Sequence, residues 1–195
     1  MNKATSSTRT LVLGAILTAL VVLLQFMGSF IRLGPFSISL VLIPIVIGAA
    51  TCGTAVATWL GLVFGAAVIL SGDAAAFLAV TIPGTVVTVL SKGALCGLLA
   101  ALTYKGVSKL SSNRYVAVIS AAIVCPIVNT GVFLICCSIF FMETITGWAQ
   151  AAGFGGGVVH YMIFVLVGAN FIVELITNII LSPVATRLIN IGSKK

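Results

Sequence analysis

The stretch Val159-HYMIFVLVGANFIVELITNII-Leu181 decides how this sequence is interpreted. It is apolar and long enough to cross the bilayer core as a helix. Within it Asn170, Glu174 and Asn178 recur at every fourth position, so on a helix they form one narrow stripe, each turned roughly 40° from the last. An acid near the middle of a membrane helix costs about 2.5–3.5 kcal/mol on insertion scales, so it normally faces a protein interior or a wet cavity. We therefore expect the other apolar runs to be walls around this stripe.

The composition excludes a soluble protein. The chain has 195 residues, of which 61% are hydrophobic and 7% charged, whereas a soluble domain carries about 25% charged residues. The net charge of +7 comes from basic residues at chain ends and in loops, where they set membrane orientation rather than nucleic-acid binding. The cysteines lie in apolar runs without C-x-x-C spacing, which predicts buried apolar residues and neither a metal site nor disulfides; they are Cys52, Cys96, Cys125, Cys136 and Cys137.

The hydropathy pattern predicts an all-α integral membrane protein, a single membrane domain over residues 1–195 with six transmembrane helices. The expected helices span residues 10–28, 37–51, 54–70, 83–104, 115–141 and 159–183. A loop or shallow re-entrant piece is expected at 71–82. With both termini cytoplasmic, eight basic residues lie inside and only Arg32 lies outside, which is a strong positive-inside signal. The sequence therefore predicts a multi-pass protein of the cell (plasma) membrane.

The sequence contains no catalytic motif, no nucleotide-binding P-loop and no metal-ligand cluster. We therefore expect no enzyme activity and no cofactor bound by this chain. Lys92 and Glu174 share the mid-membrane level, and three interpretations of them stay open. They form a structural ion pair, or Glu174 is neutral and hydrogen-bonded to asparagines, or one of them contacts a substrate or coupling ion. An alternative function is a small membrane enzyme or scaffold that uses the Lys92–Glu174 pair.

Polar and aromatic residues in the outer halves of the helices could line a pocket for a small polar molecule. His160 fits either an interfacial aromatic belt or the mouth of such a pocket, and Arg32 fits a headgroup contact or an attraction for anionic solutes. Asn129, beside Thr130 and beyond Pro126, fits helix packing or pocket lining equally well. The candidate substrate-binding residues are Asn170, Glu174, Asn129, Lys92, His160, Trp148, Arg32 and Phe77.

Three stretches of this chain resemble the substrate-binding S components of energy-coupling factor (ECF) vitamin transporters. The first is Ala15-x3-Ala19 in the first helix, a small-residue strip whose spacing also fits packing within the bundle. The second is the segment LGPFSISLVLIPIVIG at 33–48, followed by Gly53, Gly61 and Gly65. The third is Asn170-x3-Glu174-x3-Asn178 in the last helix. The resemblance covers essentially the whole chain.

The resemblance implies a division of labour. The S component captures a vitamin or related micronutrient outside the cell, while a transmembrane T component and two cytoplasmic ATPases use ATP to drive uptake. In that family the Ala-x3-Ala strip, here Ala15 and Ala19, docks onto the T component. The vitamin stays open: Arg32, Lys92 and His160 suit an anionic solute such as pantothenate or a folate, and the aromatic residues suit a flat ring such as riboflavin. We lean towards a carboxylate-bearing vitamin.

Overall fold

The computed structural model describes residues 3–30, 32–33, 36–37 and 40–193. It is almost entirely helical, with one two-stranded antiparallel ribbon in which Arg32 pairs with Ser37 and Leu33 with Phe36. The elements in order are α1 (Lys3–Gly28), β1 (Arg32–Leu33), β2 (Phe36–Ser37), α2 (Leu42–Thr51), α3 (Thr54–Leu70), α4 (Ala75–Leu78), α5 (Ile82–Leu110), α6 (Arg114–Phe140), α7 (Met142–Ala151), α8 (Val158–His160), the π-helix η1 (Tyr161–Leu166) and α9 (Gly168–Ser193).

Four of the described helices are long and apolar enough to cross a membrane. These spans are Thr8–Gly28, Ile82–Leu110, Arg114–Phe140 and Gly168–Asn190, of 21, 29, 27 and 23 residues. Two further apolar helices are shorter, because α3 has 17 residues and α2 only 10. At 1.5 Å per residue α2 is about 15 Å long, roughly half of the hydrocarbon thickness.

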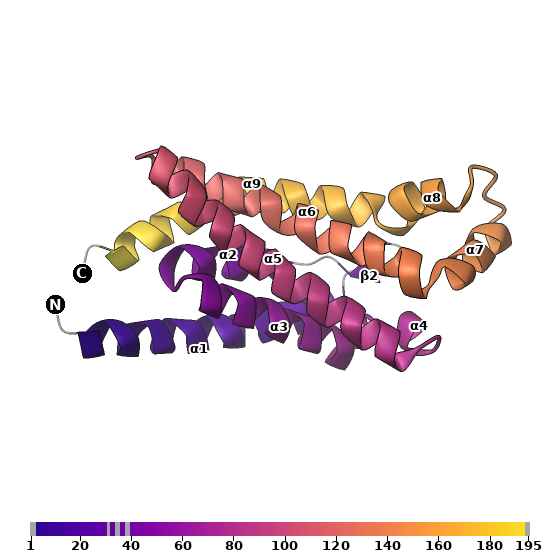
Figure 1. The fold of residues 1–195 in the computed structure, drawn as a ribbon, viewed down its shortest axis with the longest axis horizontal. Helices are drawn as coiled ribbons and strands as arrows, with labels where there is room; N and C mark the ends of the chain where they lie inside the picture. Colours follow the sequence, from indigo (N-terminus) through magenta and orange to yellow (C-terminus); the bar gives the residue numbers. More distant parts are fainter. Residues whose placement is uncertain (1–2, 31, 34–35, 38–39, 194–195) are drawn as a thin grey trace.

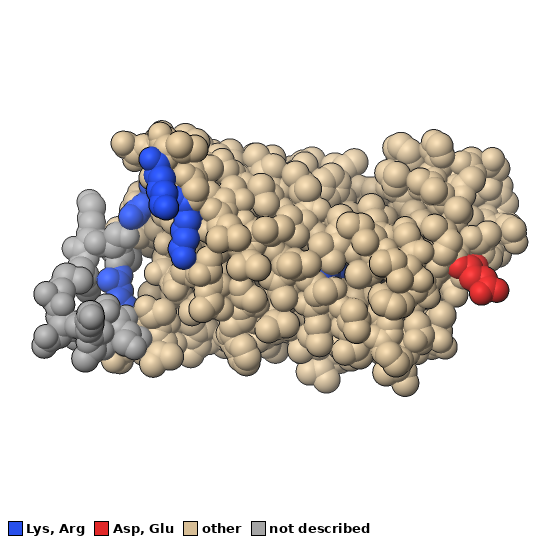
Figure 2. All heavy atoms as spheres, in the orientation of Figure 1, with Lys and Arg blue, Asp and Glu red and all other residues tan. Residues whose placement is uncertain are grey.

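The long helices lie side by side in an elongated bundle. α1 packs on α3, α3 on α5, α5 on α6, and α6 on α9. α1 begins and α9 ends at the same end of the bundle (Figure 1). On the face shown in Figure 2, most of the visible Lys and Arg gather at this end, and an acidic patch lies at the opposite end. We call these the basic end and the acidic end.

The short helix α2 lies at the centre of the basic half of the bundle. It contacts α1, α3, α5, α6 and α9, and its residues Leu42, Ile45 and Val46 are completely buried. They form one apolar cluster with residues near the basic end, including Ala100 and Ile189. No other short helix among the described residues contacts so many of the long helices.

α2 differs from the helix expected over residues 37–51. Residues 36–37 belong to β2, and the helix begins only at Leu42. Pro44 therefore lies in the first turn of α2, not in its middle. In the first turn a backbone N–H has no intrahelical partner, so proline removes no hydrogen bond there. Hydropathy could not locate this start, because the apolar run continues through both conformations.

Glycines allow α3 and α5 to pack in backbone contact. Gly61 and Gly65 of α3 face Gly93 of α5, and a Cβ atom at Gly93 would overlap the carbonyl oxygen of Gly61. Small residues four apart let membrane helices approach in this way. α5 begins sharply, with Thr81 as its N-cap and Pro83 in its first turn, and it continues to Leu110 rather than ending at residue 104.

The expected last helix, 159–183, is interrupted near its start. α8 passes into the π-helix η1, in which Val167 N donates to Met162 O across five residues (3.2 Å). α9 starts afresh at Gly168, where a Cβ atom would come within 2.9 Å of Ile163 O, and it continues to Ser193. α7 lies in the segment between the helices expected at 115–141 and 159–183, and the expected loop at 71–82 contains α4.

Candidate functional site

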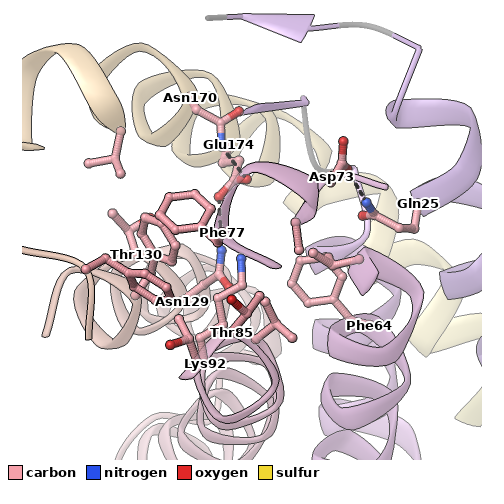
Figure 3. A pocket seen from close by; sticks show the side chains of 17 residues that line it. Gln25, Phe64, Asp73, Phe77, Thr85, Lys92, Asn129, Thr130, Asn170 and Glu174 are labelled. Atoms are coloured by element: carbon pink, nitrogen blue, oxygen red, sulfur yellow. Dashed lines mark hydrogen bonds between the residues drawn. The ribbon is translucent and has the colours of Figure 1, made fainter. Parts of the chain in front are cut away.

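A pocket lies beside the apolar cluster of α2, on the side towards the acidic end, and Phe64 and Val89 belong to both the cluster and the pocket wall. Its wall comes from α1, α3, α4, α5, α6 and α9, and no residue of α2 lines it. The empty space between the lining atoms is about 670 Å³, of which about 60 Å³ can take the centre of a water molecule. Polar side chains from four of these helices converge on it beside phenylalanine rings (Figure 3). Such a mixture is typical of small-molecule sites.

The stripe on α9 forms the polar centre of the pocket. Glu174 is only 1% exposed. Asn170 Nδ2 donates to Glu174 Oε1 (3.0 Å), and Asn129 Nδ2 of α6 donates a longer bond to Oε2 (3.5 Å). Asn178 Nδ2 donates instead to the backbone carbonyl of Glu174 (2.9 Å). The four-residue spacing thus places a buried carboxylate among amide donors, and Asn129 joins it from a neighbouring helix.

The amide oxygens of these asparagines are left without donors. Oδ1 of Asn129, Asn170 and Asn178 is buried in each case and accepts no hydrogen bond from the protein. A buried acceptor without a partner costs about 1–3 kcal/mol. Asn129 and Asn170 line the pocket, whereas Asn178 does not. Two of the three unpaired oxygens therefore belong to the pocket wall.

Lys92 brings a positive charge to the same pocket from α5. Its Nζ lies over the rings of Phe64 and Phe133, 5.3 and 5.4 Å from their centroids. Among the described residues no ion pair joins Lys92 to Glu174, although both line the pocket. The structural ion pair considered from the sequence is therefore not formed. The cation is held by ring faces, an interaction worth about 2 kcal/mol when desolvated.

The opposite wall contains a polar pair that sequence reasoning missed. Gln25 of α1 is 2% exposed, and its Nε2 donates to Asp73 Oδ2 and to Ser71 Oγ. Gln25 and Asp73 line the pocket (Figure 3). The residues are 48 apart in the chain, and Gln25 is an isolated polar residue in an apolar helix. That isolation is the same kind of signal that singled out Glu174.

Two threonines of α5 add hydroxyl groups to the pocket. Thr85 Oγ1 donates to Thr81 O and Thr88 Oγ1 to Gly84 O, each at 2.7 Å. Their hydroxyl hydrogens are therefore used within the helix, and these oxygens present acceptor lone pairs. The sequence analysis did not single out either residue.

An aromatic cluster closes the pocket towards the acidic end. Phe77 of α4 meets Phe133, Phe141 and Trp148 edge to face, at centroid distances of 5.6, 5.0 and 5.4 Å. Phe77, Phe133 and Phe141 line the pocket, whereas Trp148 lies behind Phe77 and does not line it. Trp148 was expected among the binding residues, and its place in the structure is that of a support for Phe77.

Two further candidate residues, His160 and Arg32, are not among the described residues that line the pocket. His160 is exposed and stacks on Phe164 at 6.0 Å, so it corresponds to the belt interpretation rather than the pocket mouth. The side chain of Arg32 lies outside the described residues. Of the eight candidates, the pocket wall contains Asn170, Glu174, Asn129, Lys92 and Phe77.

The described residues contain no group of three or more His, Cys, Asp or Glu that could hold a metal ion. All five cysteines are free, and four of them are buried. The pocket itself offers one ammonium group, two carboxyl groups, amides, hydroxyl lone pairs and aromatic faces, which are groups that can bind a small polar molecule.

The sequence was then compared with known proteins. Residues 9–189 match a family model described as "ECF transporter, substrate-specific component". No curated protein and no solved structure gave a match. The family match covers nearly the whole chain, including every described residue that lines the pocket.

Proposed function

This chain belongs to the family of ECF transporter substrate-specific components, and from this premise we propose that it captures a water-soluble vitamin or related micronutrient of the pantothenate, folate or riboflavin type. The family is one of transporter subunits and not of enzymes. The observation that carries the proposal is the pocket between Lys92 and the Glu174 stripe. Its polar groups are enclosed by apolar walls, and the unpaired amide oxygens call for a bound partner.

We further propose that the pocket faces the outside of the cell. The chain passes along the bundle six times if the segment through β1, β2 and α2 is counted as one pass. The basic end carries Arg9, Lys105, Lys109, Arg114 and Arg187, as expected for a cytoplasmic face. The pocket lies in the other half, so a solute would enter it from outside.

Release into the cell would require the partners that the family name implies. We propose a transmembrane T component and two cytoplasmic ATPases, because the family serves ECF complexes. Ala15 and Ala19 are exposed on α1, while the neighbouring Gly14 is buried against Val56 of α3. The outward position of the alanines supports their role in docking to the T component.

The direct test is native mass spectrometry of the full chain as expressed, followed by calorimetry with a panel of vitamins. We expect a co-purified vitamin and a dissociation constant below the micromolar range. The protein alone in liposomes should bind the solute but not accumulate it. Accumulation by the isolated chain, or no tight binding to any vitamin, would contradict the proposal.

A further inference from the structure

The pocket contains a cation whose hydrogen-bonding capacity the protein leaves unused. Lys92 is only half-buried, because its head faces the pocket. No described residue accepts a hydrogen bond from its Nζ, and the ammonium lies over two phenyl rings. An ammonium group has three N–H donors, and ring faces neutralise no charge. The group is therefore arranged to meet an anionic acceptor that the described residues do not supply.

The carboxyl groups of the pocket already accept hydrogen bonds from amide side chains of the protein. Glu174 accepts from Asn170 and Asn129, and Asp73 accepts from Gln25. No ion pair joins either acid to Lys92 among the described residues. Because Lys92 is the basic side chain of the described pocket wall, a ligand's negative charge belongs at Lys92 and away from the two acids. The Glu174 side offers two unpaired amide oxygens, on Asn129 and Asn170, which need N–H or O–H donors.

The innermost space of the pocket is small. About 60 Å³ is open to the centres of water molecules. At roughly 10–15 Å³ per water this is space for about four to six waters. A ligand as large as a flavin or a folate has to extend out of this space towards the open side of the pocket or displace side chains of its wall.

We infer that the ligand is a small monocarboxylate that also carries hydroxyl, amino or amide hydrogens, with its carboxylate on Lys92 and its donors on Asn129 and Asn170. This inference rests on the proposed function and narrows its substrate class. Among the vitamin types considered, it favours the pantothenate type. Lys92 becomes the residue that distinguishes an acid from its uncharged analogue.

The test uses pairs of compounds that differ in the carboxylate. Pantothenate and pantothenol, nicotinate and nicotinamide, and 4-aminobenzoate and 4-aminobenzamide are titrated calorimetrically into the full chain in nanodiscs, with riboflavin and thiamine as vitamins that lack a carboxylate. A charge-assisted hydrogen bond to Lys92 should favour the acid of the bound pair roughly ten- to hundredfold. Native mass spectrometry identifies the compound that co-purifies, which we expect to be a small acid.

Two variants of Lys92 and one control variant show whether a loss of acid preference comes from the lost charge or from a change in folding. Lys92→Met should bring acid and uncharged analogue to equal affinity, whereas Lys92→Arg should keep a preference for the acid. Lys105→Met is the control, since Lys105 lies on the same helix but is exposed and donates to Thr54. It should leave the preference unchanged. Lys92→Met removes a charge that has no ion-pair partner among the described residues. The unfolding temperature of this variant should therefore not be lower than that of the wild-type protein.

The possible results divide cleanly. A preference for the acid that disappears only in Lys92→Met supports the inference. An acid preference that survives Lys92→Met overturns it, as does equal wild-type affinity for both members of the bound pair. Binding or co-purification of riboflavin, thiamine or another ligand without a carboxylate also overturns it, but leaves the vitamin-binding function standing. No co-purified ligand and no binding to any vitamin would remove both.

Discussion

At the scale of single residues, the buried carboxylate of Glu174 is the most demanding group in the protein. It is 1% exposed, and two asparagine side chains supply its hydrogen bonds. An ionised carboxylate in such a place is strongly destabilising unless hydrogen bonds compensate for the lost water. The asparagines therefore hold the carboxylate in place, and through it the shape of the pocket floor.

Asn170→Ala should weaken solute binding about tenfold or more. The substitution removes the 3.0 Å bond to Glu174 Oε1, and a hydrogen bond to a charged group contributes about 1.5–3 kcal/mol. Calorimetry with the co-purified vitamin measures the change. Asn190→Ala, on the same helix at the exposed basic end, should have no effect. An unchanged dissociation constant in Asn170→Ala would remove this residue from the site.

The sequence predicted the members of this site that follow a helical period and missed those that do not. Asn170 and Glu174 were found because their spacing forms a stripe. Gln25 and Asp73 meet across 48 residues of chain, and no local pattern reports such a contact. Trp148 and His160 were included because aromatic residues are common at pocket mouths. Their positions depend on the π-helix and α7, which hydropathy does not reveal.

At the scale of helices, the contact between α3 and α5 depends on glycine. Gly61 and Gly93 face each other so closely that neither position has space for a Cβ atom. Without a hydrophobic driving force between helices in lipid, this close packing is a main source of their association. Both helices also line the pocket, through Phe64 and Lys92. Separating them would therefore move the cation away from one of its rings.

Gly93→Ala should lower the stability of the protein by about 1–3 kcal/mol, the usual result of overpacking. Gly106→Ala lies on the same helix with nothing within 4 Å of the added atom, so it should be neutral or stabilising by up to about 1 kcal/mol through helix propensity. Thermal unfolding in detergent compares the two. Equal unfolding temperatures would show that α3 and α5 separate easily.

Ala15→Trp and Ala19→Trp should block uptake and leave solute binding intact. Both positions are exposed on α1, so a large side chain there would meet the proposed T component and not the interior of the bundle. Uptake by vesicles containing the complete transporter and calorimetry on the isolated chain give the two readouts. Ile135→Trp, at a position on α6 that is 62% exposed, serves as control. Loss of binding in the alanine variants would show that the strip packs internally.

At the scale of the whole molecule, the surface cluster of Lys and Arg lies at the end of the bundle away from the pocket. The positive-inside pattern was evident in the sequence, because it depends only on where basic residues interrupt apolar runs. The number of full-length spans was not, because α2 covers only half of the membrane thickness and the apolar run around it does not show where the helix starts. Among the described residues, four helices are long and apolar enough to cross a membrane, and two further apolar helices are shorter.

The orientation can be tested by cysteine labelling in intact cells. In a variant whose natural cysteines are replaced, Gly155→Cys, in the exposed loop before α8, should react with an impermeant maleimide added outside. Ser112→Cys, between α5 and α6, should react only after the membrane is opened. The reverse pattern would place the pocket on the cytoplasmic side.

The position of α2 has a consequence for how cargo leaves. Between a solute in the pocket and the basic end of the bundle lies this short helix. Its side chains Leu42, Ile45 and Val46 have no exposed surface. Within the described part of the chain, these residues and their neighbours fill the bundle on the basic-end side of the pocket. We therefore expect a solute to leave on the side by which it entered, which agrees with what the family resemblance implies, namely that the loaded S component turns in the membrane to deliver its ligand.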